Sequence, residues 1–366
     1  MRSHVHGKMK IGATEIEEVA LGAAVLGTGG GGDPFIGKLL ALDAVAKYGP
    51  VEMIQPEEVD DEGLVIPPAL MGAPTVMVEK IPNGDESIGA MRALENKLQR
   101  KAAAITPIEQ GGLNSQIPIA VSAKLGLPMT DCDSMGRAFP ELQMTSFHLH
   151  GISATPMAMG DEKGNLLVLE TIDNVWTERL ARTATVQMGG VALIAIYPMT
   201  GAQLKKACVK GSVSLSMEIG RAIRDARQKG ENPIDDVVKL MKSKILFRGK
   251  ISDLLRRTTE GFSRGEARLQ GLEEYRDQTM TVEFQNENLV AIRDRRVVAS
   301  VPDLISVLDL ESGLPITTEG LRYGNRVVVI GSPCNEVWRT PQALATVGPR
   351  YFGYDVDYTP VERIGP

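Results

Sequence analysis

The sequence has few cysteines, few aromatic residues and no long hydrophobic run, and each scarcity excludes a class of protein. Its three cysteines among 366 residues, Cys132, Cys208 and Cys334, are too far apart for a CxxC pattern. We therefore expect neither a disulfide framework nor a four-thiolate zinc site. The longest apolar runs, such as residues 191–196, are far shorter than the ~20 residues that cross a bilayer. Aromatic residues make up 4%, so the core is expected to consist of aliphatic side chains and methionine.

Positive charge is also scarce. Lys and Arg number 40 against 46 Asp and Glu, a net charge of −6, so the chain has no basic excess with which to hold a nucleic-acid backbone. The first ten residues are followed by no apolar stretch or small-residue cleavage site, so we expect no secretory signal and a cytoplasmic protein. Hydrophobic residues at 43% and charged residues at 23% are typical of a folded globular chain, and the length suggests two domains.

Glycine, in contrast, is abundant, with 38 residues. A helix is predicted from Thr14, with Glu17 completing a capping box; it runs into the glycine loop at 27–32, and a second helix follows over 35–48. Short extended segments then alternate with helices, which predicts a layered α/β domain over residues 11–170. Residues 171–362 contain helical patches followed by many short strands, which favours a mainly-β, barrel-like domain with a helical excursion.

The glycine loop fits the pattern G-x-G-x-x-G at Gly27, Gly29 and Gly32. A dinucleotide fingerprint requires a strand before the glycines, whereas here a helix precedes them. Three interpretations stay open: a phosphate site, a backbone wall around another small ligand, or a structural turn.

The densest polar cluster is the segment 131–141, DCDSMGRAFPE. Asp131 and Asp133 flank Cys132, and Arg137 follows, so the segment combines acid, thiol and guanidinium chemistry. The alternative is a structural turn with a salt bridge from Arg137 to Glu141.

Two histidines lie just downstream. At an i, i+2 spacing in a strand, His148 and His150 would face one side and suit a metal ion or a carboxylate. The alternative is that one or both are merely hydrogen-bonded; the pair at His4 and His6 is taken as incidental.

Two further polar positions follow predicted strands. The loop Glu109 to Asn114 comes after the apolar segment 103–105, and Glu79 closes another short strand. The carboxyl ends of strands are where open α/β sheets bind ligands.

Several of these motifs, in this order, resemble the S-methyl thiohydantoin desulfurase family, which is associated with hydantoin-utilisation proteins. The motifs are LGTGGGGDP at 26–34, MGAP at 71–74, EQGGLN at 109–114, DCDSMGRAFPE at 131–141, and the C-terminal LRYGNRVVVI and VGPRYFGYD segments. The resemblance covers nearly the whole chain. It implies an N-terminal three-layer α/β sandwich, a C-terminal β-rich barrel-like domain, and hydrolysis of a hydantoin-type ring, such as release of methanethiol from an S-methylated thiohydantoin.

Such a reaction needs a base or a metal ion to activate water. A divalent ion, with zinc the first choice, would be held by Asp131, Asp133, His148 and His150. Without a metal, Asp133 or Glu109 would act as general base. Cys132 as nucleophile ranks third, because no histidine adjoins it in sequence.

The substrate-binding residues are expected to be Asn114 and Arg137, which would hold ring oxygens and a substrate carboxylate, together with Glu79 and the backbone of Gly29, Gly30 and Gly31. No nicotinamide or flavin is expected. The competing hypothesis is a non-catalytic accessory subunit that binds a nucleotide or ligand beside a hydantoinase or oxoprolinase. The sequence also allows a homo-oligomer.

Overall fold

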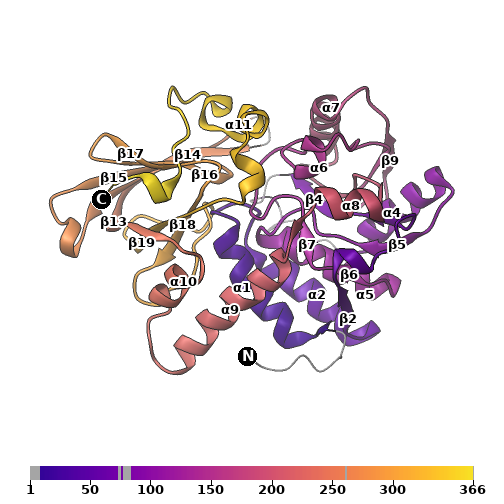
Figure 1. The fold of residues 1–366 in the computed structure, drawn as a ribbon, viewed down its shortest axis with the longest axis horizontal. Coiled ribbons are helices and arrows are strands. Elements are labelled where there is room, and N and C mark those ends of the chain that lie inside the picture. The colour runs from indigo at the N-terminus through magenta and orange to yellow at the C-terminus, as the bar shows by residue number, and fades with distance from the viewer. Residues whose placement is uncertain (1–8, 73–75, 77–83, 260–261, 366) are drawn as a thin grey trace.

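The computed structural model describes residues 9–72, 76, 84–259 and 262–365. It consists of an α/β part and a curled antiparallel sheet that lie side by side (Figure 1). The predicted combination of an α/β region followed by a β-rich region is confirmed, and the expectation of a three-layer sandwich stays a prediction. No helix in these ranges is long and apolar enough to span a membrane.

The first sheet has six short strands whose central members are parallel, as the alternation of strands and helices predicts. β1 and β11 close its edges in the antiparallel direction. In spatial order the strands are β1 (Met9–Ile11), β2 (Val51–Ile54), β6 (Met129–Thr130), β5 (Ala102–Ile105), β3 (Leu64–Ile66) and β11 (Met199–Thr200). β5 leads directly into the segment that carries Glu109.

A second, antiparallel sheet adjoins it. Its order is β4 (Pro68–Gly72), β10 (Val191–Ala195), β8 (Met157–Gly160) and β9 (Leu166–Leu169). The sequence of residues 151–171, with the turn-forming segment DEKG at 161–164, predicts a hairpin, and the structure confirms it as β8 and β9. The Asp161 side chain accepts from the backbone N–H groups of Lys163 and Asn165 in the turn. A two-stranded ladder pairs β7 (Cys132–Asp133) with β12 (Val209–Lys210).

Helices pack around these sheets and between them and the curled sheet. Among the described residues they are α1 (Ala13–Leu26), α2 (Pro34–Tyr48), α4 (Asp85–Leu98), α5 (Ile117–Leu125), α6 (Ser146–Leu149), α7 (Asn174–Gln187), α8 (Gly201–Ala207), α9 (Ser212–Gln228), α10 (Ile234–Leu240) and α11 (Pro341–Val347). Single 3₁₀ turns are η1 (Pro56–Glu58), η2 (Gly112–Ser115), η3 (Glu273–Tyr275), η4 (Glu336–Arg339), η5 (Pro349–Phe352) and η6 (Val361–Arg363).

The glycine loop joins two helices, as predicted. α1 ends at Leu26 and α2 begins at Pro34, where the Asp33 carboxylate caps the helix by accepting from the Phe35 N–H at 2.8 Å. The predicted capping box at Thr14 and Glu17 was wrong: the N-cap is Gly12, because the Glu15 side chain reaches back to the Gly12 N–H at 2.9 Å.

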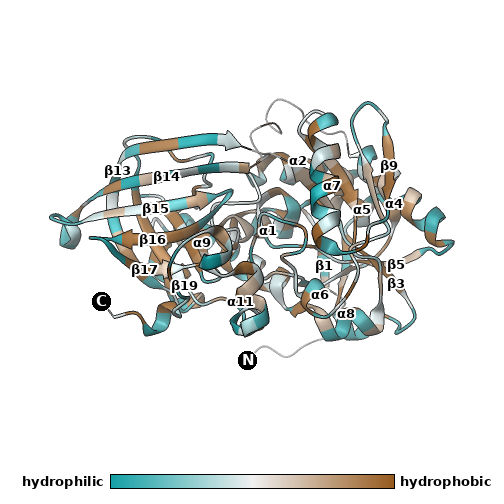
Figure 2. Cartoon of the chain, turned by 90° about the horizontal axis from the view of Figure 1, so that it is seen from above, coloured by the Kyte–Doolittle hydropathy of each residue, from teal (hydrophilic) through white to brown (hydrophobic). Residues whose placement is uncertain are grey.

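The curled sheet contains seven antiparallel strands and forms a half-barrel (Figure 2). Its order is β17 (Arg296–Ser300), β16 (Glu287–Arg293), β15 (Thr279–Gln285), β14 (Phe262–Gly271), β13 (Lys244–Thr259), β19 (Arg326–Ser332) and β18 (Leu304–Asp309). Alternating apolar residues such as Val282, Phe284 and Val329 are buried along one face. This alternation is the pattern expected of strands that bury one face.

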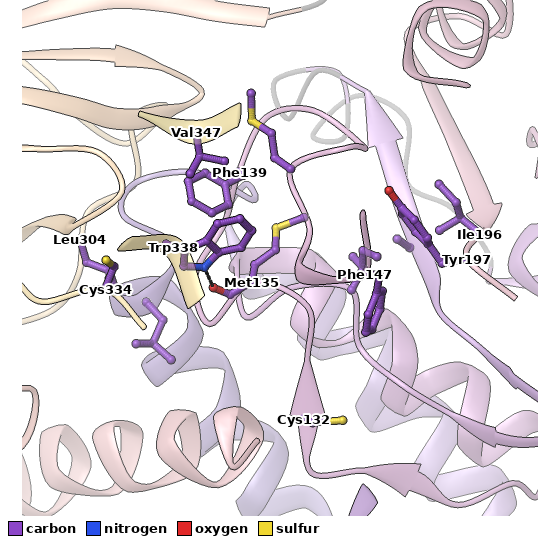
Figure 3. Packing of buried hydrophobic residues seen from close by; sticks show 14 of the residues in the cluster. Cys132, Met135, Phe139, Phe147, Ile196, Tyr197, Leu304, Cys334, Trp338 and Val347 are labelled. Carbon is purple, nitrogen blue, oxygen red and sulfur yellow. Dashed lines mark hydrogen bonds between the residues drawn. The ribbon is translucent and has the colours of Figure 1, made fainter. Parts of the chain in front are cut away.

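Within the α/β part, α1 packs closely on α9: a Cβ at Gly22 would lie 1.8 Å from the Ser216 carbonyl oxygen, so the helix backbones touch. The segment that follows the curled sheet also packs on the α/β part. Trp338 donates its indole N–H to the Met135 carbonyl at 2.7 Å and stacks edge-on against Phe139 at 4.8 Å (Figure 3). β10, β11 and β12 also return to the first part of the chain. The first strand of the curled sheet, β13, begins at Lys244, and the domain boundary expected at 170/171 stays a prediction.

Candidate active site

A small pocket opens where the α/β part meets the start of β16. Its volume is about 80 Å³, below the usual 300–1,000 Å³ of ligand sites, which favours a compact ligand. Apolar side chains form most of the wall, and four charged side chains reach it. The lining residues are Gly31, Ala69, Leu70, Met71, Gly72, Ile108, Glu109, Asn114, Met135, Phe139, Pro140, Glu141, Leu142, Arg182, Ile194, Asn286 and Glu287.

Glu109 lies four residues beyond the end of β5 and is 4% exposed. Its Oε1 accepts a hydrogen bond from Asn114 Nδ2 at 2.8 Å, and its Oε2 accepts a long one from the Phe139 N–H at 3.4 Å. Burial raises the pKa of this carboxyl to about 8, although the Asn114 hydrogen bond lowers it. A carboxyl that titrates near neutrality is suited to proton transfer.

Glu287 is the first residue of β16 and is 2% exposed. Its Oε2 has no hydrogen-bond partner among the described residues. Burial raises the pKa of this carboxyl well above its usual value, and the charge of Glu109 raises it further. A buried polar atom without a partner is costly in a folded protein. An orphaned oxygen at a pocket wall therefore points to a ligand group or water at that place.

Arg137 is fully buried behind the pocket, with four of its five N–H donors in use. It donates to the carbonyls of Ala138, Pro302 and Asp303 and to the Thr28 hydroxyl, at 2.7–3.0 Å. Burial lowers the pKa of this guanidinium to about 10, while Glu287 is the largest influence that raises it.

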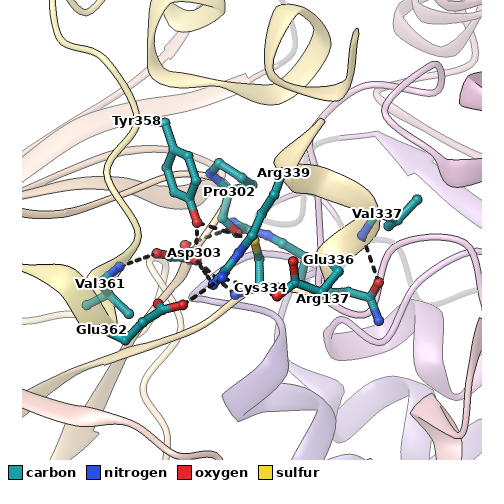
Figure 4. Close-up of polar contacts among 11 residues, drawn as sticks. Arg137, Pro302, Asp303, Cys334, Glu336, Val337, Arg339, Tyr358, Val361 and Glu362 are labelled. Carbon is teal, nitrogen blue, oxygen red and sulfur yellow. Dashed lines mark hydrogen bonds and ion pairs between the residues drawn. The ribbon is translucent and has the colours of Figure 1, made fainter. Parts of the chain in front are cut away.

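Two of the carbonyls that bind Arg137, those of Pro302 and Asp303, belong to the C-terminal half of the chain. Asp303 is itself held by the Tyr358 hydroxyl and by the backbone N–H groups of Cys334 and Val361 (Figure 4). Arg137 is thus a buried counter-charge, and its contacts leave little capacity for the substrate carboxylate that the sequence assigns to it. The alternative salt bridge to Glu141 does not form either, because Glu141 instead accepts from Tyr351 and Gln143.

Asn114 touches the pocket but its polar atoms are also occupied. Its Oδ1 accepts from the Leu70 N–H at 2.7 Å, and its Nδ2 donates to the Leu70 carbonyl and to Glu109. Asn114 therefore orients Glu109 against β4.

The glycine loop mainly packs against protein. Gly31 lines the pocket, while the Gly29 carbonyl accepts from the Thr318 N–H at 2.8 Å. Gly30 faces Glu287 so closely that a Cβ on residue 30 would lie 2.1 Å from the glutamate Oε1. Of the three interpretations of this loop, the close packing favours a structural role with one glycine at the ligand wall.

The acidic cluster of the sequence lies beside the pocket. Asp131 caps α9, with Oδ1 accepting from the Ser214 N–H at 2.9 Å and Oδ2 accepting from its hydroxyl at 2.5 Å. Both oxygens of Asp133 accept from the Gly136 N–H, and burial raises the pKa of this carboxyl to about 7. Cys132 is fully buried and donates to the Thr130 hydroxyl, and burial raises the pKa of its thiol. None of the three residues lines the pocket.

The histidines do not lie on a strand, so that prediction was wrong. His148 lies in α6 and His150 at its C-cap, because the Thr145 hydroxyl accepts from the His148 N–H and starts a helical turn. His148 Nδ1 faces the Asn174 amide, and His150 Nδ1 faces the Ser146 carbonyl.

The described ranges contain no group of three or more His, Cys, Asp or Glu side chains that could hold a metal ion. The quartet Asp131, Asp133, His148 and His150 therefore does not fit zinc in this structure. The expectation that the chain binds a divalent ion stays a prediction. Glu79, another predicted substrate-binding residue, lies outside the described residues.

Sequence reasoning missed Glu287, Asn286 and Arg182. The polar segment Asn286-Glu287-Asn288 predicts a turn between two strands; this holds for Asn286, with its φ of 59°, whereas Glu287 and Asn288 belong to β16. The available signal was a glutamate that opens the apolar strand 289–292, since a charge at such a position is rarely buried without a role. Arg182, on α7, pairs with Glu178 at 2.5 Å and lies over the Phe262 ring at 4.3 Å.

The fold and pocket thus define an α/β protein with a curled sheet and a pocket between the two that is lined in part by buried carboxyls. Family models described as S-Me-THD-like, N-terminal domain, and S-Me-THD-like, C-terminal domain, match residues 14–171 and 172–361. The chain belongs to this S-Me-THD-like family, which confirms the resemblance to the S-methyl thiohydantoin desulfurases.

No curated protein matches the chain. A solved structure that is similar is the crystal structure of a protein from Chromobacterium violaceum, with 25% sequence identity and a TM-score of 0.80. The match covers 96% of this chain and 100% of that one. This likeness supports the fold over nearly the whole chain.

Proposed function

We propose that this protein hydrolyses a small hydantoin-type cyclic amide or amidine, with release of methanethiol from an S-methylated thiohydantoin as the reaction to test first. The observation that carries the proposal is the pair of buried carboxyls, Glu109 and Glu287, in one pocket, with Glu287 Oε2 unpartnered among the described residues. Membership of the S-Me-THD-like family supports the substrate class.

The reaction needs one base and one acid. Water adds to the ring carbon between the two nitrogens and gives up a proton, the C–S bond breaks, and the sulfur leaves as methanethiol; the ring keeps the water oxygen as a carbonyl. In this scheme Glu109 takes the proton from water, because its pKa of about 8 leaves part of the population ionised at neutral pH. Glu287, whose pKa is also well above its usual value, stays protonated and donates a hydrogen bond to the ring nitrogen on which charge builds.

The surroundings support this division of roles. Arg137 supplies a buried positive charge that partly offsets the two acids without entering the pocket. Met71, Ile108 and Met135 give the pocket an apolar wall suited to the flat ring and the methylthio group.

The direct test is to incubate the purified chain with an S-methylated thiohydantoin and to follow free thiol with a chromogenic reagent. Turnover that is lost in the Glu109→Gln variant supports the proposal. An inactive wild type, or equal turnover in wild type and variant, would overturn it.

The accessory-subunit alternative has less support. A nucleotide is larger than the pocket volume allows. Its negatively charged phosphates would also lie against the Glu287 carboxyl beside the glycine loop. A nucleotide titration followed by calorimetry distinguishes the two functions. Metal analysis of the purified chain tests the zinc prediction separately, because no step of the proposed reaction passes through a metal.

A further inference from the structure

Two of the three cysteines lie on one face of the small ladder next to the active site. In that ladder Val209 pairs with Asp133, and Lys210 pairs with Cys132. Cys208 precedes β12 with extended backbone angles of −77° and 153°. Because side chains alternate along a strand and opposite residues share a face, Cys208 lies on the same face as Lys210 and Cys132. The two cysteines are thus diagonal neighbours across the ladder.

The two thiols differ in environment. Each shifts the pKa of the other: Cys208 raises the pKa of Cys132, and Cys132 lowers the pKa of Cys208. Cys132 is fully buried, whereas Cys208 is partly exposed. Cys132 and then Lys210 favour the ionised form of Cys208, so its pKa is lowered, while burial raises the pKa of Cys132. An accessible, more acidic thiol beside a second thiol is the usual arrangement in redox-sensitive cysteine pairs.

We propose that Cys208 and Cys132 are a redox modification site that closes to a reversible intramolecular disulfide when the protein meets a peroxide. The Cys208 thiolate attacks one peroxide oxygen and becomes a sulfenic acid as the O–O bond breaks and the other oxygen leaves as water. The Cys132 thiol then attacks the Cys208 sulfur, the S–O bond breaks, and a second water leaves. Two thiols and one hydrogen peroxide give one disulfide and two waters, and a dithiol reductant reverses the change.

The position of the pair connects it to the pocket wall. Ser134, two residues after Cys132, donates its backbone N–H to the Ile108 carbonyl at 3.1 Å and its hydroxyl to the same oxygen at 2.5 Å. Ile108 lines the pocket and precedes Glu109. Diagonal neighbours start farther apart than most disulfide-bonded residues, so the bond draws β12 toward β7 and shifts the segment that holds Ile108.

Cys334 provides the matched control. It is buried near the Tyr358 hydroxyl, at 3.7 Å, and its interactions include neither of the other two cysteines. Treatment of the reduced full chain with hydrogen peroxide should lower the thiol titre from three to one. Digestion without reductant should give one peptide pair joined through Cys132 and Cys208, and dithiothreitol should restore all three thiols.

The variants separate the pair from general oxidation. Cys334→Ser should still form the bond, whereas Cys208→Ser, at a partly exposed position, should keep both remaining thiols at the same peroxide dose. Cross-links through Cys334, sulfinic acid at Cys208 with Cys132 still free, or three intact thiols in the wild type would each overturn the proposal. This test depends only on the state of the thiols, so it stands apart from the proposed hydrolase activity.

Discussion

Glu109 and Glu287 face one pocket from opposite parts of the chain, and the charge of Glu109 raises the pKa of Glu287. Two buried acids that interact in this way do not ionise together without a large electrostatic cost. The first proton lost leaves one carboxylate and one carboxylic acid side by side. The proposed water activation requires this state.

Replacing Glu109 by Gln is expected to reduce methanethiol release by at least about 100-fold, the usual contribution of a general base. The amide keeps the size of the side chain but cannot accept the proton. Glu141→Gln is the matched control, since Glu141 lines the same pocket while its carboxylate is bound by Tyr351 and Gln143. We expect the control to stay within about fivefold of wild type; an equal loss in both variants would argue against a special role for Glu109.

The pH dependence of kcat/KM follows from the ionisation of the Glu109 carboxyl. If Glu109 must be ionised, kcat/KM rises about tenfold per pH unit below its pKa of about 8 and then levels off. Removing the Asn114 hydrogen bond, which lowers this pKa, should move the inflection to higher pH in Asn114→Ala. A profile that falls between pH 6 and 8, or an inflection that moves to lower pH in the variant, would contradict the assignment.

Gly30→Ala is expected to disturb both stability and activity. The added Cβ would lie 2.1 Å from Glu287 Oε1, so either the loop or the carboxyl must move. Overpacking of this kind typically costs about 1–3 kcal/mol, measurable by urea unfolding. Gly89→Ala in α4 is the control, because its Cβ would meet nothing within 4 Å and alanine favours a helix. A Gly30→Ala chain as stable and active as Gly89→Ala would mean that Glu287 needs no fixed position.

Stability itself should fall as pH rises from 5 to 8. Glu109 and Asp133 have folded pKa values of about 8 and about 7, above their ordinary values of 4.5 and 3.8. The folded chain thus keeps protons that the unfolded chain has released. Their stabilising effect is fully present below the ordinary pKa values and is lost as the pH rises through the pKa values of the folded chain. Each group contributes at most about 1.4 kcal/mol per pH unit. Urea unfolding should show a smaller decline for Glu109→Gln; a wild type that gains stability over this range would refute the linkage.

The double replacement of His148 and His150 by Ala should change turnover by less than about twofold and leave metal content as in wild type. Both rings are engaged at α6, with Asn174 and with the Ser146 carbonyl, and neither lines the pocket. Elemental analysis beside the thiol assay checks both points. Loss of a bound zinc ion in the variant would restore the metal site predicted from sequence.

Much of the fold could be predicted because the local patterns agree with it. Residues 281–284 and 326–330 have the short apolar pattern typical of strands and lie in β15 and β19, and the glycine loop between two helical patterns joins α1 and α2. Glu109 was found because it follows a buried strand. The histidine strand failed because one side-chain contact, from Thr145 to the His148 N–H, decided between a strand and a helical turn.

The candidate site could not be assembled from sequence for a different reason. Glu287 reaches the pocket only because β16 pairs with β15 and then meets the glycine loop, and no local pattern encodes a contact between segments so distant in the chain. The role of Arg137 depends likewise on carbonyls at 302 and 303. Residue types suggested acid chemistry, but packing between the two parts decided which acids meet.

The packing of Gly30 against Glu287 has a consequence for the newly made chain. One proton-transfer group is synthesised long before the other, and the glycine loop and β16 must close on each other before both are in place. Partly folded molecules would therefore be inactive. In a refolding experiment, the onset of turnover would report when the glycine loop and β16 pack against each other.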